Sequence, residues 1–418
     1  MEQDTFIWAT GIEDTFVVQP HPRTGRILDE YELTQHYRFW REDLERAAQL
    51  GVRFMRYGIP WHRVEPAPGR FDWAWTDRVL EHMVVRLGIT PIVDLVHYGT
   101  PPWLEQQFFT PAYPQRVETY VRAFVERYRS LSRYYTPLNE PSIHARYCGL
   151  LGIWPPYARS WRGYVRVMLQ LCRGIAGATR AIRELVPDAV VVHVEAGALY
   201  RTHDPALQQH VELRDHANYL GLDLLYGRVT RQHPLWSWLV ERLRVGESEL
   251  TWFAEEGKAF RADWIGVNYY PQWSTHELYC RNGVLDERLP NLGADGLERL
   301  LRVYHARTGA PVFISECAAR GAVALRARWM DASIGRVCHL HQSGFPVIGY
   351  TWWPLFSLVT WTYLRGRYPL ERYLAHMGLW DLRRAPDGTL ERCRTPLVDR
   401  FAEYVRTGLC RAAGRNPL

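Results

Sequence analysis

Two short segments each place a glutamate at the end of an apolar run that is typical of a β-strand. Residues 136–141 (TPLNEP) contain Glu140, and residues 313–316 (FISE) end in Glu316. Cleaving a glycosidic bond requires one carboxyl group that protonates the leaving oxygen and a second that stabilises or attacks the anomeric carbon. Together the two glutamates therefore predict the hydrolysis of a glycoside.

Taken singly, a glutamate that ends a strand is more often a surface charge than a catalytic group. Here both glutamates have polar or aromatic companions at neighbouring strand ends, and this combination favours the catalytic interpretation. In the run Asn139-Glu140-Pro141, the proline restricts the preceding residue and lacks an amide donor. We expect it to help hold Glu140 at a fixed exit from its strand.

The rest of the chain alternates short apolar runs with longer amphipathic ones. Several apolar runs are nearly continuous, as in strands buried on both faces. We predict strands over residues 5–9, 52–57, 90–97, 134–139, 189–195, 264–269, 311–316 and 346–353. We predict helices over residues 41–50, 75–87, 115–130, 161–185, 295–308, 324–342 and 396–406.

Eight strands with helical connections favour a closed (β/α)8 TIM barrel over an open sheet. The segment 204–262 is long for one crossover, and we expect it to add a helix and a loop over the rim. Nothing in the composition marks a linker, so residues 1–418 are interpreted as one catalytic domain.

In such a barrel the active site lies where the strands end. Two alternatives stay open at this point: His97 as a hydrogen-bonded core histidine, and the tryptophans as core rather than as platforms for sugar rings. The polar and aromatic residues at the strand ends are Arg56, His97, Tyr98, Asn139, Glu140, Asn268, Tyr270, Glu316, Trp352 and Trp353.

The composition argues against several other classes of protein. The net charge of +6 arises from 51 basic and 45 acidic residues that are scattered along the chain, so we expect no nucleic-acid partner. No leader-like or membrane-spanning apolar segment is evident. The seven cysteines lack metal-binding spacing, and free thiols in a cytoplasmic protein fit them best. Oligomeric state is not predicted.

The motifs resemble those of glycoside hydrolase family 1, the β-glucosidase and β-galactosidase family whose barrel carries its catalytic glutamates after strands four and seven. The resemblance rests on residues 50–66 (LGVRFMRYGIPWHRVEP), 91–104 (PIVDLVHYGTPPWL), 136–141, 147–156 (YCGLLGIWPP), 263–271 (DWIGVNYYP), 313–317 (FISEC) and 349–361 (GYTWWPLFSLVTW). It implies a carbohydrate substrate, with binding residues Arg56, His97, Tyr98, Asn139, Asn268, Tyr270, Trp353, Thr360 and Trp361.

The resemblance also implies a retaining mechanism without a metal or organic cofactor. Glu140 would be the acid/base, with a raised carboxyl pKa, and Glu316 the ionised nucleophile. Arg56 and the Tyr270 hydroxyl would favour the ionised form of Glu316. Asn139 would donate a hydrogen bond to the sugar 2-hydroxyl.

The chain departs from the family pattern near the sugar. The strand-one glutamine that grips sugar hydroxyls is missing before Ile12, and Thr360 replaces the glutamate that binds the 4- and 6-hydroxyls. A tyrosine, Tyr98, replaces a tryptophan, and Cys317-Ala318 replace asparagine and glycine after the nucleophile. The catalytic pair is kept, so we expect a glycosidase whose sugar specificity differs from that of ordinary members.

Three alternatives stay open. Arg365 and Arg367 follow Thr360 and suit a 6-phospho- or other anionic sugar. The serine–lysine–tyrosine spacing of the phospho-sugar branch is not reproduced, however, so a neutral but unusual sugar is favoured. The others are a transglycosidase and a barrel that binds saccharide without turnover in polysaccharide biosynthesis, and the presence of both carboxylates argues against the last.

Overall fold

The structure is a computed structural model that describes residues 6–255 and 260–408. Eight parallel strands close into a barrel, because β1 pairs with both β4 and β13. The strands are β1 (Ile7–Gly11), β4 (Phe54–Gly58), β5 (Thr90–Asp94), β6 (Tyr134–Thr136), β7 (Val190–Ala196), β9 (Trp264–Tyr269), β12 (Val312–Cys317) and β13 (Val347–Trp352). The predicted barrel is confirmed, and each predicted strand overlaps an observed one; Thr5 lies outside the described residues.

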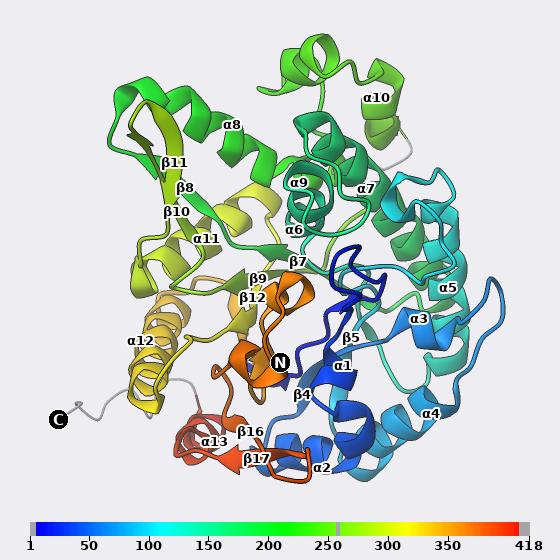
Figure 1. The fold of residues 1–418 in the computed structure, drawn as a ribbon, viewed down its shortest axis with the longest axis vertical. Coiled ribbons are helices and arrows are strands. Elements are labelled where there is room, and N and C mark those ends of the chain that lie inside the picture. The colour runs from blue at the N-terminus through cyan, green and yellow to red at the C-terminus, as the bar shows by residue number, and fades with distance from the viewer. Residues whose placement is uncertain (1–5, 256–259, 409–418) are drawn as a thin grey trace.

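Helices surround these strands (Figure 1). They are α2 (His36–Gln49), α4 (Ala74–Glu81), α5 (Tyr113–Tyr128), α7 (Trp161–Leu185), α11 (Gly293–Thr308), α12 (Val323–Gln342) and α13 (Leu397–Thr407). The hydroxyl of Ser160 accepts from the Gly163 amide and thereby caps α7, whose bounds match the prediction. The single helix predicted over residues 75–87 is wrong in one respect, because α4 passes into a π-helical turn, η1 (His82–Arg86).

Alternate side chains of each strand point into the barrel, and they determine what fills its interior. Phe54 and Arg56 are two residues apart on β4, as are Ile92 and Asp94 on β5, so each pair points to the same side of its strand. Ile92, Val192 and Phe313 belong to a fully buried apolar cluster against which Phe54 packs. The barrel is therefore filled with apolar side chains below a buried layer of charged ones at the carboxyl ends of the strands.

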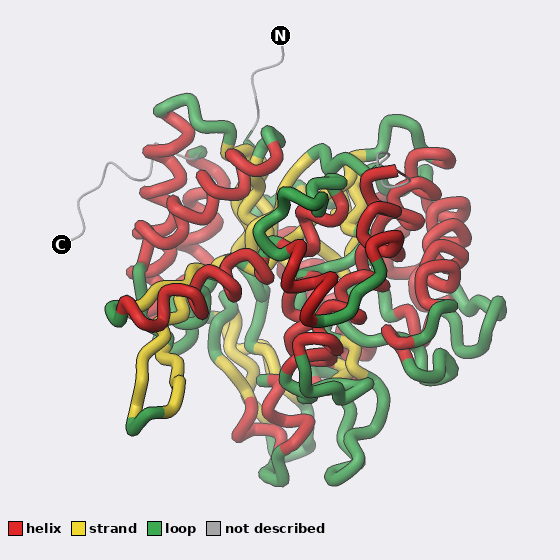
Figure 2. Tube along the Cα trace, turned by 90° about the horizontal axis from the view of Figure 1, so that it is seen from above, coloured by secondary structure: helices red, strands yellow, loops and turns green. Residues whose placement is uncertain are grey.

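The long segment after β7 builds part of the rim. It contains β8 (Leu199–Thr202), η4 (Pro205–Leu207), α8 (Gln208–Asn218), α9 (Leu220–Leu225), η5 (Trp238–Arg242) and α10 (Glu247–Glu255), which confirms the extra helix and loop expected there. A hairpin that was not predicted, β10 (Thr275–Arg281) with β11 (Val284–Arg288), pairs with β8. Its turn, Asn282-Gly283, has positive φ at both residues, as such two-residue turns require. Figure 2 shows the hairpin extending from the body of the molecule.

Short elements complete the described chain. They are β2 (Phe16–Val17), β3 (Leu28–Asp29), α1 (Glu30–Leu33), α3 (Trp61–Val64), η2 (Gln107–Phe109), α6 (Pro141–His144), η3 (Ala145–Leu150), β14 (Leu358–Val359), η7 (Trp361–Arg365), η8 (Leu370–Tyr373), β15 (Leu374–Ala375), β16 (Trp380–Arg384) and β17 (Leu390–Arg394). Within residues 6–255 and 260–408, none of the helices has the length and apolarity needed to cross a membrane.

Five of the seven cysteines are free thiols, as expected: Cys148, Cys172, Cys280, Cys317 and Cys393. The expectation is wrong for Cys338, which is disulfide-bonded. Cys410 lies outside the described residues.

Candidate active site

A cavity of about 840 Å³ opens at the carboxyl ends of the barrel strands. Three of the predicted site residues, Arg56, Asn139 and Trp353, are fully buried and lie behind its lining. The Trp353 ring stacks on His97, with 5.9 Å between ring centroids. The predicted residues that line the cavity are His97, Tyr98, Glu140, Asn268, Tyr270, Glu316, Thr360 and Trp361.

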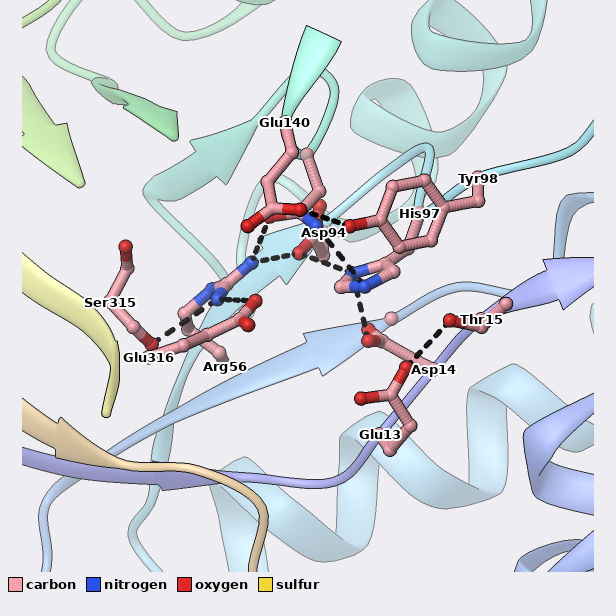
Figure 3. A network of polar contacts seen from close by, with 12 residues as sticks. Glu13, Asp14, Thr15, Arg56, Asp94, His97, Tyr98, Glu140, Ser315 and Glu316 are labelled. Atoms are coloured by element: carbon pink, nitrogen blue, oxygen red, sulfur yellow. Dashed lines mark hydrogen bonds and ion pairs between the residues drawn. The ribbon is translucent and has the colours of Figure 1, made fainter. Parts of the chain in front are cut away.

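Glu316 is held on both carboxylate oxygens. Arg56 Nη1 donates to its Oε1 at 2.7 Å, and the Tyr270 hydroxyl donates to its Oε2 at 2.7 Å. Figure 3 shows Arg56 between Glu316 and Asp94, to which its other terminal nitrogen donates. Burial raises the pKa of Glu316, and the charge of Arg56 and the hydroxyl of Tyr270 oppose that rise. Both contacts stabilise the carboxylate form.

Glu140 has different surroundings. It follows β6 at the start of α6, with a left-handed backbone (φ 47°) that non-glycine residues adopt only when their surroundings enforce it. The Tyr98 hydroxyl donates to Glu140 Oε2, and Asn268 Nδ2 donates to Oε1 at 2.8 Å. Burial and the charge of Glu316 raise the pKa of Glu140 to about 8. A carboxyl group in this state is protonated at neutral pH and can act as a general acid.

His97 is fixed by two aspartates. Its Nδ1 lies 2.8 Å from Asp14 Oδ1 and 3.1 Å from Asp94 Oδ2, and its Nε2 lies 3.1 Å from Asn139 Nδ2. Although burial opposes it, the two carboxylates raise the pKa of His97 well above its ordinary value. The three residues bring atoms of the kind that ligate metals within 4.8 Å of one another. Because Arg56 already supplies a cation to Asp94, we interpret the group as an ion-pair cluster.

Four functional residues were missed from the sequence. Asp94 anchors Arg56, Asp14 anchors His97, and the Ser315 hydroxyl fixes the Asn268 amide through a 2.6 Å bond to its oxygen. Glu13 lines the cavity, where its carboxylate accepts from the Thr15 hydroxyl at 2.6 Å and from Trp353 Nε1 at 3.3 Å. A usable signal was present for the first two, since Asp94 ends the apolar run PIVD, and Asp14, with Glu13, ends the run GIED after the first predicted strand.

The loop after Thr360 carries Arg365 and Arg367, the two arginines of the anionic-sugar alternative. Thr360 lines the cavity, and its hydroxyl lies 2.9 Å from that of Thr362. Arg365 and Arg367 are exposed and are not among the residues that line the cavity. The structure therefore does not bring these two arginines to the predicted site.

A family model described as glycosyl hydrolase family 1 matches residues 9–283. The chain belongs to glycosyl hydrolase family 1. This membership makes the protein a glycoside hydrolase, and retention of configuration is the general mechanism of that family. The low identity to curated relatives marks it as a divergent member of glycosyl hydrolase family 1.

Two curated relatives differ in the substrates that their names state. The chain is 25% identical to β-glucosidase A of Thermotoga maritima over 78% of each chain. It is 24% identical to the 6-phospho-β-glucosidase of Dickeya chrysanthemi over 78% of this chain and 76% of that relative. The solved structure of the Thermotoga maritima β-glucosidase with azafagomine superposes with a TM-score of 0.81 at 21% identity, over 97% of this chain and 98% of the other, and shows the shared fold.

Proposed function

We propose that the protein is a retaining β-glycosidase in which Glu140 is the acid/base and Glu316 the nucleophile. The observation that carries the proposal is the contrast between their surroundings. Glu316 contacts the Arg56 guanidinium, whereas Glu140 receives hydrogen bonds from the neutral donors of Tyr98 and Asn268. When two neighbouring carboxyl groups have surroundings that separate their pKa values, one serves as acid and the other as anion.

The reaction follows in two steps. In the first, a carboxylate oxygen of Glu316 attacks the anomeric carbon and forms a glycosyl ester while Glu140 gives its proton to the departing oxygen. In the second, the Glu140 carboxylate takes a proton from water, the water oxygen attacks the same carbon, and Glu316 is released. This sequence requires the two carboxyl groups to lie about 5–5.5 Å apart.

We keep Asn139 as the proposed donor to the sugar 2-hydroxyl, although its side chain is fully buried behind the cavity lining. Its amide oxygen accepts from Arg56 Nη2 at 3.0 Å and from Asn268 Nδ2 at 3.3 Å. Its Nδ2 lies 3.1 Å from His97 Nε2, so one N–H of its NH2 group is left to donate to a sugar. We assign His97 and Trp361 to the same sugar-binding end of the cavity. The proposal takes the chain as one catalytic domain of a cytoplasmic enzyme that needs no metal or organic cofactor.

We propose a neutral sugar at this end. The carboxylate of Glu13 lines the cavity, and its charge adds to the rise in the pKa of Glu316, so the two carboxylates share one region. A phosphate or carboxylate on the sugar would be repelled there. Arg365 and Arg367, which would have offset this repulsion, are not part of the cavity lining. Arg320 and Arg372 do line the cavity, so the 6-phospho alternative rests on these two arginines and on the names of relatives.

Turnover of a panel of aryl β-glycosides tests the proposal. We expect release of the phenol from at least one neutral sugar, loss of release in Glu316→Gln, and little release from 6-phospho-sugars. Glu126→Gln, an exposed site on α5, is the matched control for the same substitution. Absence of release from every glycoside would contradict the enzyme proposal, and preference for a 6-phospho-sugar would contradict the neutral one.

A further inference from the structure

We propose that the cavity wall opposite the sugar is an aglycone site for a leaving group that carries a carboxylate, held by Arg146 and Arg214. The inference rests on the proposed function, because the assignment of Glu140 as the acid defines which side of the cavity receives the leaving group. A general acid lies beside the oxygen that it protonates. The chain that follows Glu140 is therefore expected to border the aglycone.

Two segments meet at this wall. Arg146 belongs to η3 (Ala145–Leu150), which directly follows the short helix that starts after Glu140, and Arg214 belongs to α8. The three-stranded sheet of β8, β10 and β11 faces them, with Tyr200 on β8 and Glu287 on β11. All four side chains line the cavity.

One carboxylate serves both arginines. Arg146 Nη2 donates to Glu287 Oε1 at 3.3 Å, and Arg214 Nη1 donates to Glu287 Oε2 at 2.8 Å. Against the effect of burial, a hydrogen bond with His276 and the charge of Arg146 lower the pKa of Glu287 to about 2. Two guanidinium groups therefore face one carboxylate, which leaves this part of the wall with an excess of positive charge.

Both guanidinium groups retain N–H donors that are available to a ligand. Arg146 uses two of its five N–H donors, one to Glu287 and one from Nη1 to the Tyr200 hydroxyl at 3.3 Å. Arg214 uses one of its five, to Glu287. Their side chains are 26% and 27% exposed. Arginine binds carboxylates through paired N–H donors. The same wall offers aromatic surface, since Tyr200 stacks on His276 at 4.8 Å between ring centroids.

The charge distribution of the cavity also gives the substrate a direction. Glu13 and Glu316 contribute negative charge at the sugar end, part of which Arg56 neutralises. On the aglycone wall Arg146 and Arg214 outnumber the single carboxylate of Glu287. A substrate with an anionic leaving group is therefore attracted in the productive orientation and repelled in the reversed one.

A matched pair of substrates tests the inference: the 4-carboxyphenyl and 4-carbamoylphenyl β-glycosides of whichever sugar is turned over. We expect Arg146→Gln and Arg214→Gln to lower the ratio of kcat/KM for the acid to that for the amide by about tenfold, which corresponds to about 1.4 kcal/mol. Glu287→Gln removes the carboxylate that competes with the substrate for the two arginines, and this variant should raise the ratio. Comparing ratios between variants cancels the intrinsic difference between the two phenols.

The control is Arg372→Gln, which removes a charge from an exposed arginine that also lines the cavity. An equal fall of the ratio in this variant, or an unchanged ratio in all variants, would overturn the inference while leaving the glycosidase proposal intact. If no glycoside is cleaved, the proposed function fails, and calorimetry of 4-hydroxybenzoate against 4-hydroxybenzamide decides the anion site. Tighter binding of the acid that is lost in Arg146→Gln supports the site, and equal binding refutes it.

Discussion

The hydrogen bond from Tyr98 to Glu140 allows a quantitative prediction that is specific to this chain. The Tyr98 hydroxyl and the Asn268 amide both stabilise the Glu140 carboxylate and thereby limit the rise of its pKa to about 8. A hydrogen bond to a charged group contributes about 1.5–3 kcal/mol, and one pKa unit corresponds to about 1.4 kcal/mol. Tyr98→Phe should therefore raise the pKa of Glu140 by about one unit. This is the lower end of the range that the two figures give, because water in the cavity can replace part of the lost hydrogen bond.

The direction of the effect on activity follows from the role of the proton. Glycosylation needs protonated Glu140, so kcat/KM falls as the pH rises through its pKa. A higher pKa moves this alkaline limb to higher pH. Deglycosylation needs the carboxylate as base, so kcat at neutral pH should fall if this second step limits turnover.

The assay is the pH dependence of kcat/KM for an aryl β-glycoside in the wild-type enzyme and the variant. Tyr113→Phe is the matched control, because Tyr113 is fully buried and its hydroxyl has no hydrogen-bond partner among the described residues. An alkaline limb that stays in place, or that moves to lower pH, in a folded Tyr98→Phe enzyme would refute the reasoning.

Two further predictions concern the charged layer of the barrel. Arg56→Gln removes the cation shared by two buried carboxylates, so we expect near-complete loss of activity and destabilisation by about 3–5 kcal/mol, seen as a lower melting temperature; an unchanged melting temperature would contradict this. Glu13→Gln removes the proposed repulsion at the sugar end and should raise kcat/KM for 6-phospho-glycosides relative to neutral ones about tenfold or more. An unchanged ratio would exclude Glu13 as a determinant of sugar charge.

The barrel could be predicted because its strands are apolar runs that carry their own signal. The residues at which the strands end were predicted less accurately. The sequence predicts one strand from residue 90 through His97, whereas β5 ends at Asp94 and the chain takes positive φ at Tyr98 and Gly99. The hairpin of β10 and β11 was missed even though Asn282-Gly283 is a strong turn signal, because its strands are largely polar and pack on β8 rather than on the barrel.

Most site residues could be predicted from sequence motifs. The residues that were missed depend on contacts between segments that lie far apart in the sequence. Arg56 meets Asp94 because β4 and β5 are neighbours in the barrel. His97 meets Asp14 although β4 lies between the strands that they follow, β5 and β1. Each aspartate follows an apolar run, but nothing local in the sequence shows which side chain it contacts. The burial of Trp353 behind His97 likewise depends on packing across the barrel.

The central claim is that Glu316 forms a covalent bond to the sugar and that Glu140 acts as the general acid and then as the general base. Its most direct test is incubation with an activated 2-fluoro-β-glycoside of the preferred sugar, followed by mass spectrometry of the protein and its peptides. We predict a stoichiometric mass increase of one fluoro-sugar on the peptide that contains Glu316, and none in Glu316→Gln. Labelling of a different residue, or turnover without any covalent adduct, would contradict the assignment.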